Sequence, residues 1–325
     1  MRGIRSRIIS FTLLLALAGG CGKEGEHLPR FRSGGVETEH GWAELRRFTD
    51  PSGGAFTLAG IPERIISSAP SNTEIVIDLG LGENLIAVDT YSMGLAGLAD
   101  NLPFIDFAYP DAEAIIALRP DLILASEHNR VAGNDPFKLI RDAGIGVAYI
   151  PTSGSIAEIY RDIGFIAGLL GVGDRGEGLI RSMREAVDRI AAIGSAIPER
   201  RTVYFEISPP PHIVSFGRGT FLHEMLELTG AKNVFAEAAG WIAPGAEAIV
   251  AADPQVILTN AALSKGSGMG DPVKEILARP GFSGVRAIRN KAVYRIDADS
   301  SSRPSPRITR ALREMARAIY PEYYE

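Results

Sequence analysis

The stretch DAEAIIALRPDLILA, from Asp111 to Ala125, decides how this chain is organised, because the sequence uses its pattern twice. From Ala112 to Ile116, apolar residues recur at the i, i+3 and i+4 spacing of a short helix with one buried face. Pro120 is expected to end that helix, since proline disfavours helical backbone in the residue before it. The apolar run Leu122–Leu124 then predicts a buried strand.

The same pattern returns from Gly245 to Thr259 as GAEAIVAADPQVILT, at an offset of 134 residues, with eight of the fifteen aligned residues identical. A helix–proline–strand unit used twice at one offset predicts two lobes built on one plan. Each copy carries a glutamate at its helix start, Glu113 in the first and Glu247 in the second. One interpretation is structural, because a carboxylate is favourable at the positive end of a helix dipole. The other is a pair of equivalent surface contacts.

Composition limits the function classes. The 325 residues can bury a large core and form two domains. An apolar content of 46% and a charged content of 22% are typical of a globular protein. The net charge of -5, without a basic stripe, argues against a nucleic-acid binder. Five scattered histidines, with no HExxH or CxxC motif, predict neither a metal site nor a cofactor of the protein's own.

The N-terminus predicts export. Three arginines precede the apolar run Ile8–Ala18, which is too short to span a bilayer but suits the core of a signal peptide over residues 1–20. Cys21 is the only cysteine, and the small residues before it resemble a bacterial lipoprotein cleavage site, where the cysteine receives lipid. The alternative is a plain secretory signal that leaves a free thiol. We expect a protein on the periplasmic or cell-surface side, membrane-anchored through Cys21, with residues 21–41 as a flexible tether.

Strands and helices alternate after the tether at the spacing of parallel α/β lobes. We expect a first lobe over residues 42–172, which opens with a β-hairpin and continues with a helix that Ser71 or Asn72 caps. The interdomain segment over residues 173–195 follows; its helical run from Asp174 to about Ile193 has twenty residues and reaches roughly 30 Å at 1.5 Å per residue, enough to connect two lobes. A second α/β lobe occupies residues 196–325.

Three motifs in this order resemble one family. They are APSNTE at Ala69–Glu74, ALRPDLI at Ala117–Ile123 and PSPRI at Pro304–Ile308. With them, the chain from Phe48 to Tyr320 resembles the periplasmic binding proteins of ABC importers for iron complexes and vitamin B12. The resemblance implies two α/β lobes joined by a single long interdomain helix, with the ligand cleft between the lobes. It also implies small closure movements, and we expect a monomer.

The resemblance assigns a role to the repeated glutamates. Glu113 and Glu247 fall where the family places one docking glutamate per lobe, which meets arginines of the membrane permease. The permease subunits in turn work with a cytoplasmic ATPase. A two-fold permease needs one equivalent contact per lobe, which agrees with the internal repeat. Carboxylate–arginine pairs are directional, and exposed pairs contribute little binding energy. We therefore expect these pairs to set the register of docking more than its affinity.

The resemblance also suggests ligand-binding residues. Tyr91, Phe107 and Trp241 align with positions of the B12 binder, and the last two stand six residues ahead of Glu113 and Glu247. Flat ligands suit such aromatic walls, although these rings could instead only pack the lobes. Further candidates are Tyr109, Arg218 and Arg303 for anionic iron chelates, and His212, together with His128, for a haem iron. A lone arginine or histidine in these loops could equally be a solvated surface group.

The predicted function is therefore an exported substrate-binding component of an ABC importer. It would capture a siderophore-type iron complex or a corrinoid, as a small-molecule metal complex, and deliver it to the permease. Two alternatives stay open, a haem-binding member of the same family and a chelatase-like enzyme with the same lobe design. A catalyst needs a clustered acid, base or metal set. The sequence offers none, so we predict a binding protein with no catalytic residues.

Overall fold

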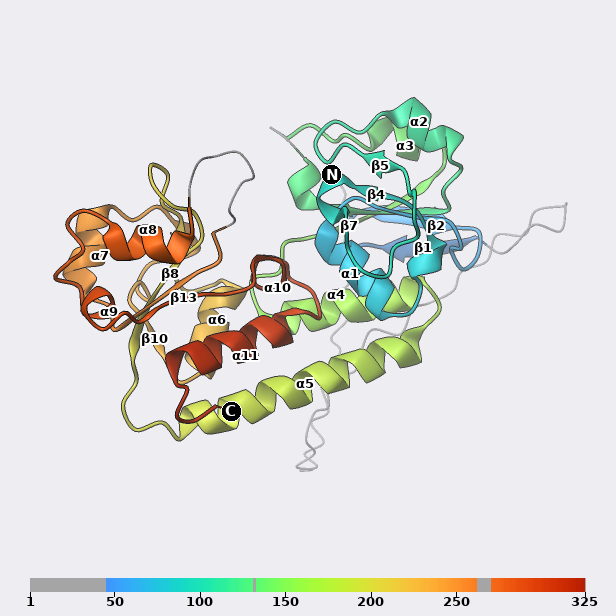
Figure 1. Ribbon diagram of the computed structural model, residues 1–325. Helices are drawn as coiled ribbons and strands as arrows, with labels where there is room; N and C mark the ends of the chain where they lie inside the picture. The colour runs from blue at the N-terminus through green and yellow to red at the C-terminus, as the bar shows by residue number, and fades with distance from the viewer. Residues whose placement is uncertain (1–44, 131–132, 262–269, 325) are drawn as a thin grey trace, which may run out of the picture. The chain divides into compact units, whose positions relative to one another are not determined.

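The computed structural model describes residues 45–130, 133–261 and 270–324 (Figure 1). The predicted signal peptide, the tether and Cys21 lie outside the described residues. Within the described ranges, no helix is both long enough and apolar enough to cross a bilayer.

The first lobe opens with an antiparallel hairpin of β1 (Arg46–Thr49) and β2 (Ala55–Leu58). A five-stranded parallel sheet follows, in the order β5 (Phe104–Ile105), β4 (Leu85–Asp89), β3 (Ile65–Ser67), β6 (Leu122–Ser126) and β7 (Gly146–Ile150). Its helices are α1 (Pro70–Asp78), α2 (Ala112–Ala117), α3 (Lys138–Asp142) and α4 (Ile156–Leu169), with the 3-10 turns η1 (Gly82–Asn84), η2 (Thr90–Ser92) and η3 (Glu127–Asn129).

Strand β6 shows why this sheet is parallel and covered on both faces. All five of its residues are buried. Leu122 and Leu124 face the large core cluster, whereas Ile123 and Ala125 face a second cluster on the opposite side of the sheet. A strand buried on both faces is a continuous apolar run rather than an alternating one, which is the pattern that the sequence shows.

The second lobe has a four-stranded parallel sheet in the order β10 (Lys232–Asn233), β8 (Thr202–Glu206), β12 (Val256–Thr259) and β13 (Val293–Arg295). A separate antiparallel pair joins β9 (Ser215–Phe216) to β11 (Trp241–Ile242). Its helices are α6 (Phe221–Leu228), α7 (Ala246–Ala252), α8 (Pro272–Ala278), α9 (Arg286–Arg289), α10 (Ala298–Ser302) and α11 (Ile308–Ile319).

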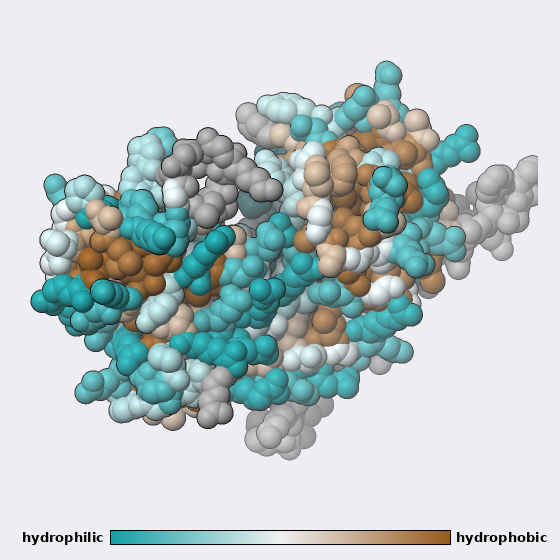
Figure 2. Space-filling model, in the orientation of Figure 1, coloured by the Kyte–Doolittle hydropathy of each residue, from teal (hydrophilic) through white to brown (hydrophobic). Residues whose placement is uncertain are grey.

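Helix α5 (Gly173–Ser195) connects the lobes with 23 residues. It packs against α4 of the first lobe and against α6 and α11 of the second. The buried side of α5 includes Met183, Val187 and Ile190, while its outer side carries mostly hydrophilic residues (Figure 2). The predicted fold class, two α/β lobes joined by one long helix, is confirmed.

Both copies of the repeat fold as a short helix, a proline and a buried strand. The single buried residue of α2 is Ile115, and that of α7 is its equivalent Ile249. The residue before each proline has left-handed backbone, with φ of 48° at Arg119 and 42° at Asp253. This conformation helps to turn the chain from helix to strand across a short link, four residues between α2 and β6 and three between α7 and β12, and it is uncommon for residues other than glycine.

The predicted cap of the first long helix is wrong. Helix α1 begins at Pro70, and Ala69 stands at its N-cap without a side-chain hydrogen bond. Proline is pre-organised for the first helical position, where its missing N–H costs nothing. Asn72 is instead buried and donates to the Ala125 carbonyl oxygen at 3.3 Å, which ties the helix start to β6.

Candidate functional site

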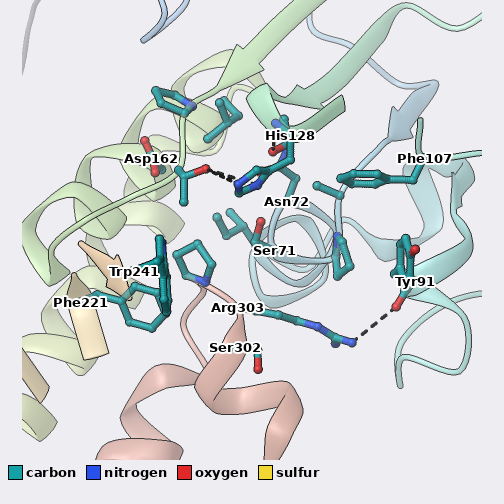
Figure 3. A pocket seen from close by; sticks show the side chains of 18 residues that line it. Ser71, Asn72, Tyr91, Phe107, His128, Asp162, Phe221, Trp241, Ser302 and Arg303 are labelled. Atoms are coloured by element: carbon teal, nitrogen blue, oxygen red, sulfur yellow. Dashed lines mark hydrogen bonds between the residues drawn. The ribbon is translucent and has the colours of Figure 1, made fainter. Parts of the chain in front are cut away.

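A cavity of about 380 Å³ lies at the carboxyl ends of the first lobe's parallel strands (Figure 3). The residues that follow β3, β4, β6 and β7 line one side of it, and residues of the second lobe line the other. Ligands of open parallel sheets bind at this end of the strands, because loops from several strands converge there. The lining comprises Ala69, Pro70, Ser71, Asn72, Ile75, Tyr91, Phe107, Ser126, His128, Ile150, Pro151, Thr152, Asp162, Phe221, Trp241, Ser302, Arg303 and Pro304.

Aromatic rings stand on two sides of this cavity, Tyr91 and Phe107 on one and Trp241 and Phe221 on the other (Figure 3). Tyr91 and Phe107 meet edge to face, with ring centroids 5.5 Å apart. Trp241 is held edge to face against Phe216, at 6.3 Å. The exposed fractions of Tyr91 and Trp241 are 65% and 52%, which leaves large ring surfaces free to contact a ligand.

Arg303 lies at the cavity, but its charge is already matched. Its guanidinium is 2.7 Å from Glu74 Oε1 and 2.8 Å from Asp299 Oδ1, and it donates to the Tyr91 carbonyl oxygen at 3.4 Å (Figure 3). Glu74 is fully buried on α1 and also accepts a hydrogen bond from Ser305 Oγ at 2.5 Å. Arg303, the only arginine among the lining residues that the structure describes, is therefore committed to a contact between the lobes.

The polar end of the cavity holds His128, Thr152 and Asp162. Thr152 Oγ1 lies 3.3 Å from the ring nitrogens of His128 (Figure 3). Asp162, on α4, is only 7% exposed and accepts a hydrogen bond from Ser153 Oγ at 2.5 Å. Burial raises the pKa of the Asp162 carboxyl from 3.8 to about 6, because desolvation disfavours the charged form. No group of three or more metal-ligating side chains occurs within the described ranges.

The structure brings five of the eight predicted ligand-binding residues together, namely Tyr91, Phe107, His128, Trp241 and Arg303. The other three do not line this cavity. Tyr109 is 74% exposed in a turn where its backbone N–H donates to Asp106 Oδ1. The Arg218 guanidinium donates to the Glu237 carbonyl oxygen, and His212 is exposed in a loop of the second lobe.

Two further lining residues, Phe221 and Asp162, were not predicted from the sequence to bind the ligand. Phe221 is buried at the start of α6 and gives no local sign that its ring borders a cavity. Asp162 did give a signal. It is an acidic residue between Ile159 and Ile163, both fully buried, on the apolar side of α4. A charged residue at a core position is expensive unless it has a partner or a function.

The repeated glutamates lie away from the cavity, on the second residue of α2 and of α7. Glu113 and Glu247 are both exposed, and neither forms an ion pair or a side-chain hydrogen bond with a residue that the structure describes. Ile116 and Val250 follow them three positions later, on the same helix faces, and each is 36% exposed. The two copies therefore present matching surfaces, each with a carboxylate that has no partner among the described residues and that lies beside a branched apolar side chain.

Comparison with known proteins identifies the class. Residues 65–300 match the family model for periplasmic binding proteins, so the chain belongs to this family. The resemblance inferred from the motifs is confirmed.

Three similar proteins illustrate the family. An ABC transporter substrate-binding lipoprotein of Bacillus subtilis, itself uncharacterized, is 33% identical over 85% of this chain and 86% of its own length. The vitamin B12-binding protein of Vibrio parahaemolyticus is 29% identical, over 80% of this chain and 91% of its own. A crystal structure from Staphylococcus epidermidis, described as a possible iron-binding (periplasmic solute-binding) protein, superposes with a TM-score of 0.71. It is 31% identical and covers 80% of this chain and 100% of that one.

Proposed function

We propose that this protein is the substrate-binding component of an ABC importer and that its ligand is a corrinoid. The observation that carries the choice of ligand is the cavity's combination of aromatic walls from both lobes with no unpaired cation among the described lining residues. The B12-binding relative supports the same assignment.

The charge balance distinguishes corrinoids from the other ligands of this class. Ferric catecholates and the propionates of haem are anionic, and anions are best held by guanidinium or ammonium groups. Arg303 is neutralised by Glu74 and Asp299, and Asp162 adds negative charge to the opposite end of the cavity. A corrinoid instead surrounds a broad ring with neutral amides, which suit aromatic walls and polar acceptors.

Haem is the second candidate, because the imidazole of His128 lines the cavity. A neutral imidazole is a common axial ligand of haem iron. Thr152 could orient this ring through its hydroxyl group. A haem ligand would leave its propionates without a cation from the described lining, and for this reason we place it second.

Ligand titration tests the proposal. The purified protein, freed of ligand, is titrated calorimetrically with cyanocobalamin, haem and a ferric catecholate. We expect saturable binding of cyanocobalamin at one molecule per chain, no chemical change in the ligand, and weaker binding of the other two. Tight binding of haem or the catecholate, with none of cyanocobalamin, would contradict the corrinoid assignment.

Substitution of Trp241 by alanine should weaken corrinoid binding by about 1–3 kcal/mol, or about 5- to 150-fold, because an aromatic wall is lost. The ring is half exposed and rests on Phe216, so its removal should leave folding intact. Calorimetric titration measures the loss. The control is Tyr294→Ala, which removes an exposed aromatic ring on β13 outside the cavity. If the two variants bind the corrinoid with equal affinity, Trp241 only packs against its own lobe and does not contact the ligand.

Delivery requires a surface that the permease recognises. We assign this role to the matching faces of α2 and α7, since each offers an exposed apolar side chain and a glutamate without a partner in the described part of the chain, at the same repeat position. A permease of two related subunits would meet one such face per lobe through its arginines. A cytoplasmic ATPase would complete the importer.

Anchoring is the third part of the proposal. The Bacillus subtilis relative is named a lipoprotein, and Cys21 stands directly after the predicted signal peptide. We expect Cys21→Ser to move the mature protein from the membrane fraction to the soluble exported fraction, because the lipid would be attached to the Cys21 thiol and the sequence has no other cysteine. Fractionation followed by immunoblotting measures the distribution. A variant that stays in the membrane fraction with unchanged processing would contradict lipid attachment at Cys21.

A further inference from the structure

Asp162 occupies an unusual place in α4. Its neighbours one helical turn away, Ile159 and Ile166, are fully buried in the large core cluster. Asp162 itself is only 7% exposed, yet the surface that it retains belongs to the ligand cavity (Figure 3). A carboxylate in such a position loses most of its hydration without becoming part of the apolar core.

The carboxylate is only partly satisfied by the protein. Asp162 Oδ2 accepts the hydrogen bond from Ser153 Oγ, whereas Oδ1 accepts none from the residues that the structure describes. No ion pair neutralises it within that part of the chain. The nearest cation in sequence, Arg161, pairs with Glu158 at 3.0 Å. An ionised carboxylate can accept about four hydrogen bonds, so Asp162 has acceptor capacity left, and its side chain lines the cavity.

This arrangement costs the fold stability. Burial of a carboxylate without a cation is unfavourable, and an asparagine or an apolar residue would fit the same position at less cost. Buried charges are normally paired with a cation, and positions that lack this pairing without a structural gain are expected at functional sites. The Ser153 hydroxyl holds the carboxylate in one orientation, as a preformed binding group requires.

We propose that Asp162 is a ligand-binding residue whose Oδ1 accepts a hydrogen bond from an N–H donor on the rim of the bound molecule. The proposal rests on the corrinoid function above and specifies it further. Asp162 selects a neutral primary amide at this point of the rim and rejects a carboxylate there, because two carboxylates would repel each other at close range. It thus sets the charge preference at the polar end of the cavity, opposite the neutralised Arg303.

The test compares cyanocobalamin with its separated monocarboxylic acid derivatives, in each of which one rim propionamide is hydrolysed to a carboxylate. Binding is titrated at pH 8 for the native protein, Asp162→Asn and the control Asp174→Asn, which alters an exposed aspartate on α5. In the native protein and the control, we expect at least one acid derivative to bind about tenfold or more weakly than cyanocobalamin. Asp162→Asn should lose that discrimination and should bind cyanocobalamin itself several-fold more weakly.

Two outcomes would overturn the inference. If all acid derivatives bind the native protein as well as cyanocobalamin does, Asp162 does not select an amide; this comparison needs no variant. If a folded Asp162→Asn variant keeps the native discrimination, another residue is responsible. Both outcomes leave corrinoid binding intact. Failure of the native protein to bind cyanocobalamin at all would overturn the proposed function, and the inference with it, and is distinguished by the first titration.

Discussion

Reversal of charge at both Glu113 and Glu247 to arginine is expected to reduce ligand uptake by the cognate permease at least tenfold, with ligand affinity and thermal stability near native. Both carboxylates are exposed on short helices away from the cavity. Their favourable interaction with the helix dipoles contributes only about 0.3–1 kcal/mol each. Docking should be affected more strongly, because in the proposed complex each new arginine would face arginines of the permease as a like charge.

The measurement is transport, and ligand-stimulated ATP hydrolysis, by the permease complex reconstituted in liposomes. Glu113→Ala combined with Glu247→Ala should give an intermediate rate, since alanine removes attraction without adding repulsion. The matched control is Glu83→Arg combined with Glu177→Arg, which changes the net charge equally at exposed sites outside α2 and α7. Native transport by the Glu113→Arg, Glu247→Arg protein would refute the docking assignment, whatever the ligand.

Elements with strong internal patterns could be predicted from the sequence. The repeat was predictable because a proline fixes where each helix ends, and because the apolar run that follows is short enough to favour a strand buried on both faces over a helix. Helix α5 was predictable because Met183, Val187 and Ile190 keep helical spacing along one face. In these segments, local preference and tertiary burial demand the same structure.

The cavity could be predicted only in part. Tyr91 and Tyr109 are both aromatic residues in loops that follow strands, and the sequence does not distinguish them. A local turn keeps Tyr109 out of the cavity lining, because the Asp106 side chain accepts a hydrogen bond from the Tyr109 backbone N–H and the Tyr109 side chain stays exposed. Arg303 appeared to be a free cation for an anionic ligand. Its partner Glu74 stands 229 residues earlier, and no local pattern can reveal a contact that only the closure of two lobes creates.

That contact leads to the second large effect, which concerns stability. Glu74 is fully buried, with Arg303 at 2.7 Å, Arg307 at 3.5 Å and Ser305 at 2.5 Å. Removal of one member of a buried ion pair is costly, because the remaining charge is left without a partner in a poorly solvated place. We expect Glu74→Ala to lower the free energy of unfolding by about 3 kcal/mol, near the lower end of the usual range, since both arginines keep some access to water.

Denaturant unfolding at pH 7 measures this loss, and Glu83→Ala, an exposed glutamate of the same lobe, serves as its control. For a chain of 325 residues, a loss of this size corresponds to a decrease in Tm of roughly 4–5 °C. The combination of Glu74→Ala with Arg303→Met should cost less than the sum of the two single changes, because the second substitution removes the charge that the first left unpaired. Additive costs would mean that the pair contributes nothing as a pair.

Loss of the Glu74 charge should also affect ligand choice. Once Glu74 is gone, Arg303 keeps only Asp299, whose side chain is 64% exposed and therefore neutralises it poorly. The cavity then gains positive charge beside Tyr91. Glu74→Gln, which preserves the shape of the side chain, should therefore strengthen binding of an anionic ligand such as a ferric catecholate relative to cyanocobalamin. The ratio of the two affinities, measured in the native protein and in the variant at equal ionic strength, tests this shift in ligand preference. An unchanged ratio would show that Arg303 has no electrostatic influence on the ligand.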